Sequence, residues 1–132
     1  DLSLIIFAIP LSLHLLNVIL IFEIPDREAD IHGKKKNFIV KKGRKKSYKL
    51  ISIIFWITTL YFIILALSGW FANSINFWFF SIISSIPTIY STYTYLKNPI
   101  EQKQATIFAI RTAISLFTFS IIILIYMILL QI

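Results

Sequence analysis

Four long apolar stretches alternate with shorter polar segments along this chain. They cover about residues 2–22, 50–68, 75–95 and 105–130. Each is close to the roughly 20 residues that an α-helix needs to cross the hydrocarbon core of a bilayer. The pattern therefore predicts an all-α protein, a polytopic transmembrane bundle of four helices that forms a single domain over residues 1–132.

The composition supports this class. Hydrophobic residues make up 58% of the chain and charged residues only 14%, whereas a soluble domain carries roughly 25% charged residues. The chain contains no cysteine, which excludes disulfides and thiolate metal sites. We therefore expect an integral protein of the cell membrane.

The distribution of positive charge predicts an orientation. Of the thirteen lysines and arginines, nine lie between Lys34 and Lys49, and the connection over residues 69–74 has none. By the positive-inside rule, the acidic and basic loop at 23–49 is predicted to lie in the cytoplasm. Because the net charge of +7 is concentrated in that loop, it does not indicate nucleic-acid binding. Arg111, near the start of the fourth stretch, is expected to snorkel to the same interface.

The segment that follows the first apolar stretch gathers four carboxylates. Glu23, Asp26 and Asp30 have the spacing that lines up side chains on one helix face, whereas Glu28 points elsewhere. Carboxylates at the edge of a bilayer repel one another and are costly to desolvate, so a divalent cation is a physical reason to gather them. With the lysines beside it, the segment predicts a site for Mg²⁺ and a phosphate-bearing substrate.

Simpler interpretations remain open for both charged segments. The acids could form a solvated helix end that pairs with nearby lysines. Lysine runs beside membrane spans commonly set topology and attract anionic lipid. A non-catalytic membrane protein with a lipid-binding polybasic loop is therefore an alternative, and scrambling the loop at constant charge would separate it from an enzyme.

The residues from Ile21 to Gly43 read IFEIPDREADIHGKKKNFIVKKG. This run resembles the second aspartate-rich motif of the UbiA superfamily of membrane prenyltransferases, which commonly reads N-E-F-P-D-x-E-A-D and then G-K-[KR]-[TN]-L-x-V-[RK]-x-G. It is most similar to the branch that prenylates dihydroxynaphthoate. Family members have nine spans, with this motif after the sixth. The resemblance implies the C-terminal part of a nine-helix fold, whose partners include the missing N-terminal helices of the same protein.

The resemblance also implies an activity, which is Mg²⁺-dependent transfer of a prenyl group from a polyprenyl diphosphate to an aromatic acceptor. It assigns Asp26 and Asp30 as catalytic ligands of the Mg²⁺-diphosphate, with Glu23 supporting the metal. Its basic positions near the diphosphate correspond to Lys35, Lys36 and Lys41. The resemblance also implies that Lys35 and Lys36 are catalytic residues. The fragment alone is expected to be inactive, because the first aspartate-rich motif belongs to an earlier span.

Two positions depart from the family pattern. Phe22 stands where asparagine is common, and Lys34 occupies the usual glycine position, with Gly33 one residue earlier. A CDP-alcohol phosphatidyltransferase is a second enzymatic alternative, because such enzymes also use membrane aspartates and a divalent metal. Its pattern, D-G-x-x-A-R before G-x-x-x-D-x-x-x-D, does not occur in this chain.

Overall fold

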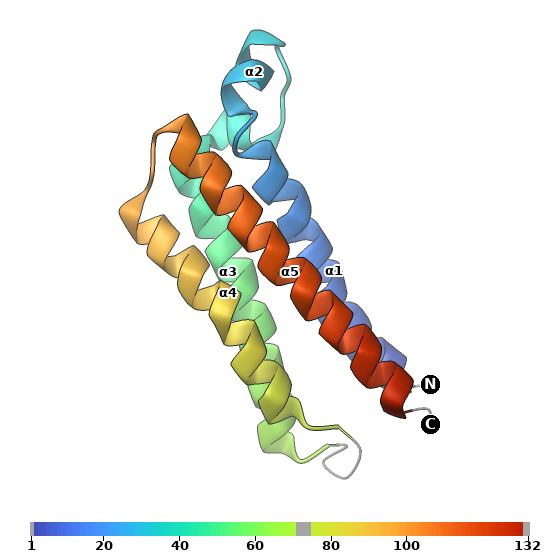
Figure 1. The fold of residues 1–132 in the computed structure, drawn as a ribbon. Helices are drawn as coiled ribbons and strands as arrows, with labels where there is room; N and C mark the ends of the chain where they lie inside the picture. Colours follow the sequence, from blue (N-terminus) through green and yellow to red (C-terminus); the bar gives the residue numbers. More distant parts are fainter. Residues whose placement is uncertain (1, 71–74, 131–132) are drawn as a thin grey trace.

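The computed structural model describes residues 2–70 and 75–130, which form helices and connections without a β-strand. The helices are α1 (Leu2–Glu23), α2 (Arg27–His32), α3 (Phe38–Ser68), α4 (Phe77–Lys97) and α5 (Gln102–Leu130). The four long helices run side by side, α2 stands at one end of the bundle, and both chain ends lie at the other (Figure 1). The all-α prediction is confirmed. Residues 71–74 of the predicted outer connection lie outside the described residues.

Three helices are long and apolar enough to cross a membrane. The qualifying stretches are Ile5–Glu23 in α1, Phe38–Ser68 in α3 and Gln102–Leu129 in α5. The 22 residues of α1 extend about 33 Å, which matches a hydrocarbon core about 30 Å thick. Large aliphatic side chains remain exposed along these helices, including Ile64 and Leu124, as lipid contact requires. The chain is thus a membrane protein. Which membrane it occupies, and on which side of that membrane the loop at 23–49 lies, stay predictions.

The helix α4 corresponds to the predicted span at 75–95 but is not among those three, because hydroxyl residues lower its hydropathy. Two of these hydroxyls, those of Thr88 and Thr92, bond to α3. The Oγ1 atoms of Thr59 and Thr88 lie 2.8 Å apart, and Ser52 Oγ lies 2.9 Å from Thr92 Oγ1. Polar side chains that bond across a helix pair are typical of membrane bundles. That α4 forms a fourth membrane span therefore stays a prediction.

Buried side chains fill the bundle in two clusters. The cluster nearer α2 contains Tyr48, Ile51, Phe55, Phe108 and Leu116. The cluster at the other end is rich in aromatic rings: Phe7, Phe62, Phe77, Phe80 and Phe119. Within it, the ring centroids of Phe7 and Phe80 are 5.1 Å apart in an edge-to-face arrangement, a favourable geometry for aromatic pairs. These clusters hold the long helices together beneath α2.

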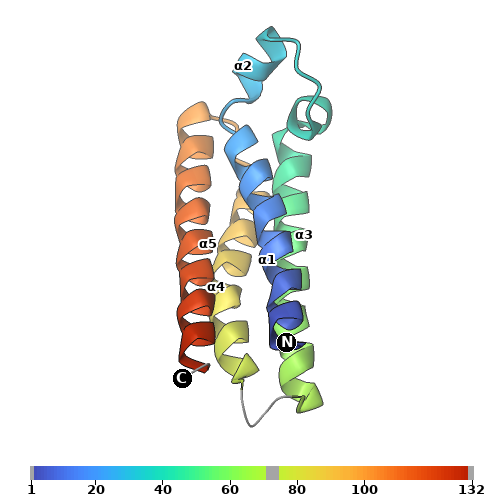
Figure 2. The same cartoon turned by 90° about the vertical axis from the view of Figure 1, so that its right-hand side faces the viewer.

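Sequence analysis expected a helix only in the acidic part of the predicted loop at 23–49, from Glu23 to Asp30, but most of this loop is helical. It contains α2, and α3 begins at Phe38, well before the apolar stretch at 50–68. Asn37 caps α3, because its Oδ1 accepts a hydrogen bond from Val40 N at 2.9 Å. The charged residues indicate where a helix leaves the lipid, but the helix itself can continue through them. Figure 2 shows α2 and the start of α3 beyond the bundle of long helices.

Gly43 divides α3 at a kink. Its φ of 79° and ψ of 165° are not helical and lie in a region that essentially only glycine occupies. A Cβ at this position would meet no atom within 4 Å, so the cost of a side chain is purely conformational. We expect Gly43→Ala to lower the free energy of unfolding in detergent by about 2 kcal/mol.

Gly33→Ala is the matched control for this prediction. Gly33 has a φ of −75°, and a Cβ there would come no closer than 3.4 Å to Ala29 O. We expect it to change the unfolding free energy by less than about 0.5 kcal/mol. Equal losses in the two variants would contradict the conformational explanation.

Candidate functional site

A turn separates the predicted carboxylates into two helices. α1 ends at Glu23, and α2 begins after Pro25 and Asp26, where the missing N–H of a proline costs least. Glu23, Asp26 and Asp30 therefore do not lie on one continuous helix face as expected. All three nevertheless act on one cation. Asp30 raises the pKa of Lys35 most, through its hydrogen bond and its charge, and the charges of Asp26 and Glu23 raise it further.

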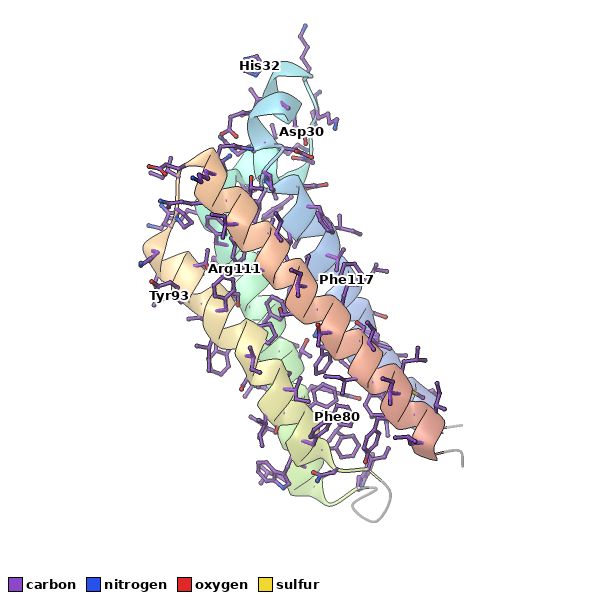
Figure 3. The ribbon with its side chains drawn as sticks, viewed as in Figure 1. Asp30, His32, Phe80, Tyr93, Arg111 and Phe117 are labelled. Atoms are coloured by element: carbon purple, nitrogen blue, oxygen red, sulfur yellow. The ribbon has the colours of Figure 1, made fainter. Side chains whose placement is uncertain are left out.

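Asp30 is the centre of this arrangement. Its side chain is only 7% exposed, and both carboxylate oxygens are bound. Lys35 Nζ lies 2.7 Å from Oδ1, and Asn37 Nδ2 donates to Oδ2 at 2.7 Å. The backbone N–H of Lys35 also donates to Asp30 O at 2.9 Å. The segment from Gly33 to Asn37 thus wraps around one buried carboxylate, on the side of α2 that faces the bundle (Figure 3).

The Asp30–Lys35 ion pair persists over a wide pH range. The hydrogen bond from Lys35 lowers the pKa of Asp30, and the same bond raises the pKa of Lys35. The contribution of Asp30 is fully present above the ordinary carboxyl pKa of about 3.9 and is lost as pH falls through the lowered value. That of Lys35 is present below about 10.4 and is lost as pH rises through the raised value.

The backbone of this segment places left-handed residues where the motif has glycine. Lys34, at the usual glycine position, has a φ of 56°, and Gly43, the last glycine of the motif, has a φ of 79°. Left-handed φ values favour glycine, because a side chain there is strained. Gly33 has an ordinary φ of −75°. In this chain a lysine therefore occupies a position with a strained, left-handed φ.

The predicted metal ligands do not form a ready cage. Within residues 2–70 and 75–130, no three His, Cys, Asp or Glu side chains gather closely enough to hold one ion. Mg²⁺ commonly takes one or two carboxylates and completes its shell with water and phosphate oxygens. Asp26 is exposed and Glu23 half-buried, so their oxygens remain accessible. The donors thus fit Mg²⁺ brought in with a phosphate, while an ion at Asp30 would compete with Lys35.

The structure separates the three predicted lysines. Lys35 pairs with Asp30, whereas Lys36 and Lys41 are exposed, and neither ammonium group forms an ion pair in the described part of the chain. The backbone N–H of Lys41 donates to Asn37 O at 3.2 Å in the first turn of α3. Lys35 is thus the lysine that the fold fixes beside the acids.

Arg44 is a central residue that sequence reasoning missed. Its side chain is 10% exposed and donates to Ile100 O at 2.6 Å, to Glu28 Oε2 at 2.5 Å and to the side-chain oxygen of Gln102. It also donates to Ile24 O at 3.4 Å. Arg44 therefore joins the α1–α2 turn to the α4–α5 connection. Two features of the sequence could have indicated this role. One is Gly43, directly before Arg44, and the other is Glu28, whose spacing keeps it off the helix face expected for the other three acids.

Comparison with known proteins adds no assignment. No protein-family model, curated protein or solved structure matches this chain. The roles of Glu23, Asp26, Asp30 and the lysines therefore stay predictions, supported by the motif between Ile21 and Gly43 and by the geometry around Asp30.

Proposed function

We propose that this chain carries one half of the diphosphate site of a UbiA-type membrane enzyme. The enzyme would transfer a prenyl group from a polyprenyl diphosphate to an aromatic acceptor, in quinone or related isoprenoid lipid synthesis. The observation that carries the proposal is the ordered cluster of Asp30, Lys35 and Asn37 at the polar end of an apolar bundle. The left-handed backbone at Lys34 and Gly43 supports the alignment with the motif.

The position of the cluster suits an amphipathic substrate. The diphosphate would lie at the α2 end, where the Lys35 side chain is 68% exposed and its ammonium group lies next to Asp30. The isoprenoid tail would lie along the apolar helices. Bound Mg²⁺ would neutralise charge on the departing diphosphate. Glu23 and Asp26 are the accessible carboxylates that would hold it, and Asp30 would join them only in exchange for its bond to Lys35.

The residues of this chain would contribute charge and position. Lys35 would stabilise the negative charge that develops on the leaving oxygen, because its bond to Asp30 holds the ammonium group in place before that charge develops. Asn37 holds the carboxylate of Asp30 in one orientation and also caps α3. The exposed Lys36 and Lys41 would add attraction for the diphosphate.

The test is prenyl transfer in membranes that contain the complete gene product. Labelled polyprenyl diphosphates of several chain lengths are supplied with dihydroxynaphthoate and related phenols. We expect Mg²⁺-dependent release of pyrophosphate together with a prenylated, lipid-soluble product, and loss of both after chelation of the metal. If neither pyrophosphate nor product forms with any acceptor in the presence of Mg²⁺, the proposed function is wrong.

A further inference from the structure

A second cationic site lies between α4 and α5, apart from the acidic cluster. A hollow of about 180 Å³ there is lined by Tyr90, Tyr93, Lys97, Gln104, Phe108 and Arg111, among others. Tyr93 and Arg111 come from neighbouring stretches of α4 and α5 (Figure 3). The hollow therefore combines two cations with aromatic rings between two long helices.

The two cations have no acidic partner. Lys97 and Arg111 are exposed, and neither forms an ion pair with a carboxylate in the part of the chain that the structure describes. Arg111 lies about 14 Å along α5 from Gln102, at 1.5 Å per residue. A cation at such depth in a membrane helix is costly unless it reaches the interface or an anion. Lys97, at the end of α4, lies 4.8 Å from the centroid of the Tyr93 ring.

The surroundings of the hollow are apolar. Phe108 is buried, and its ring centroid lies 5.8 Å from that of Tyr90. Ile107 also lines the hollow, and exposed aliphatic side chains continue along α5 at Ile110 and Ile114. A ligand with an anionic head group and long apolar chains would pair with the two cations and cover the exposed apolar side chains.

We propose that the hollow between α4 and α5 binds the phosphate of an anionic phospholipid. Lys97 and Arg111 hold the phosphate, Gln104 lines the head-group space, and the acyl chains lie along the exposed isoleucines of α5. Basic pockets between membrane helices are a known way of holding anionic head groups. The site does not depend on the prenyl-transfer proposal, because none of its residues belongs to the motif between Ile21 and Gly43.

The experiment measures lipid binding to the purified protein in a neutral detergent. Phosphatidylglycerol is titrated against the wild type, with phosphatidylcholine and free glycerol phosphate as comparison ligands. We expect phosphatidylglycerol to bind more tightly than either, and the variant K97Q/R111Q to bind it about 30-fold more weakly, since each cation contributes about 1 kcal/mol.

The matched control is K49Q/K103Q. It removes two positive charges from exposed lysines that do not line the hollow, and its affinity should stay within about threefold of the wild type. Equal losses in the two double variants would mean that only total charge matters, which overturns the proposal. Equal binding of glycerol phosphate and phosphatidylglycerol would assign the hollow to a soluble phosphate and would also overturn it. Helicity and elution volume check that each variant is folded.

Discussion

Replacing Arg44 by methionine is expected to lower the free energy of unfolding by about 3 kcal/mol, because the loss of a mostly buried guanidinium leaves several of its hydrogen-bond acceptors unpaired. The guanidinium is 10% exposed and bonds to Glu28, Gln102 and the carbonyl oxygens of Ile24 and Ile100. Methionine keeps the aliphatic packing but satisfies none of these groups. Unfolding of the purified protein in mixed detergent, followed by helicity, measures the difference.

Arg27→Met is the control for this prediction. Arg27 also contacts Glu28, but at 3.4 Å, and its side chain is 29% exposed. In the described structure it forms no hydrogen bond or ion pair with the α4–α5 connection, so its removal should cost less than about 1 kcal/mol. The explanation through the network fails if the two methionine variants unfold at the same denaturant concentration.

The long helices could be predicted because their signal is local. An apolar run of about 20 residues has few alternatives to a membrane helix, since its backbone must satisfy its own hydrogen bonds in lipid. The predicted stretches at 2–22 and 105–130 accordingly lie within α1 and α5, with ends that differ by a few residues at most. The fold class followed from composition and spacing alone.

The features that escaped prediction depend on contacts between distant segments. The hydroxyls of α4 reduce its apolar character, and only the structure shows that Thr88 and Thr92 use them against α3. Arg44 bonds to Ile100 and Gln102, more than fifty residues away in the chain. No periodicity within one helix could reveal such partners.

The residues of the candidate site stay a prediction, and their internal order differs from the expected one. The spacing of Glu23, Asp26 and Asp30 predicted a common environment, and the pKa of Lys35 is raised by its hydrogen bond to Asp30 and by the charges of all three. The turn between α1 and α2, however, replaced the single helix face. From the sequence alone, Lys35 and Lys36 were equally good candidates for the position beside the diphosphate. In the structure Lys35 is the one that pairs with Asp30, directly after Lys34 with its left-handed φ.

Lys35 pairs with Asp30 and its neighbour Lys36 does not, so comparing variants of the two gives the sharpest test of the proposed chemistry. In the complete gene product, Lys35→Ala is expected to reduce kcat/KM for prenyl transfer by about 10²–10³-fold, the usual cost of removing one group that stabilises developing negative charge. Asp26→Ala should have a comparable effect by weakening the hold on Mg²⁺. Lys36→Ala should cost less, because its ammonium group is not fixed beside the acids in the described structure.

Folding and charge must be separated from chemistry in this test. Lys35→Ala leaves the buried carboxylate of Asp30 without its cation, so helicity and membrane insertion are measured for this variant alongside its activity. Lys49→Ala, which removes an exposed charge from α3 outside the cluster, should keep the wild-type rate. Lys35→Arg should restore part of the activity if positive charge at this position is what the reaction requires. Near-normal transfer by both Lys35→Ala and Asp26→Ala would refute the site, because the substrate would then be held by other residues.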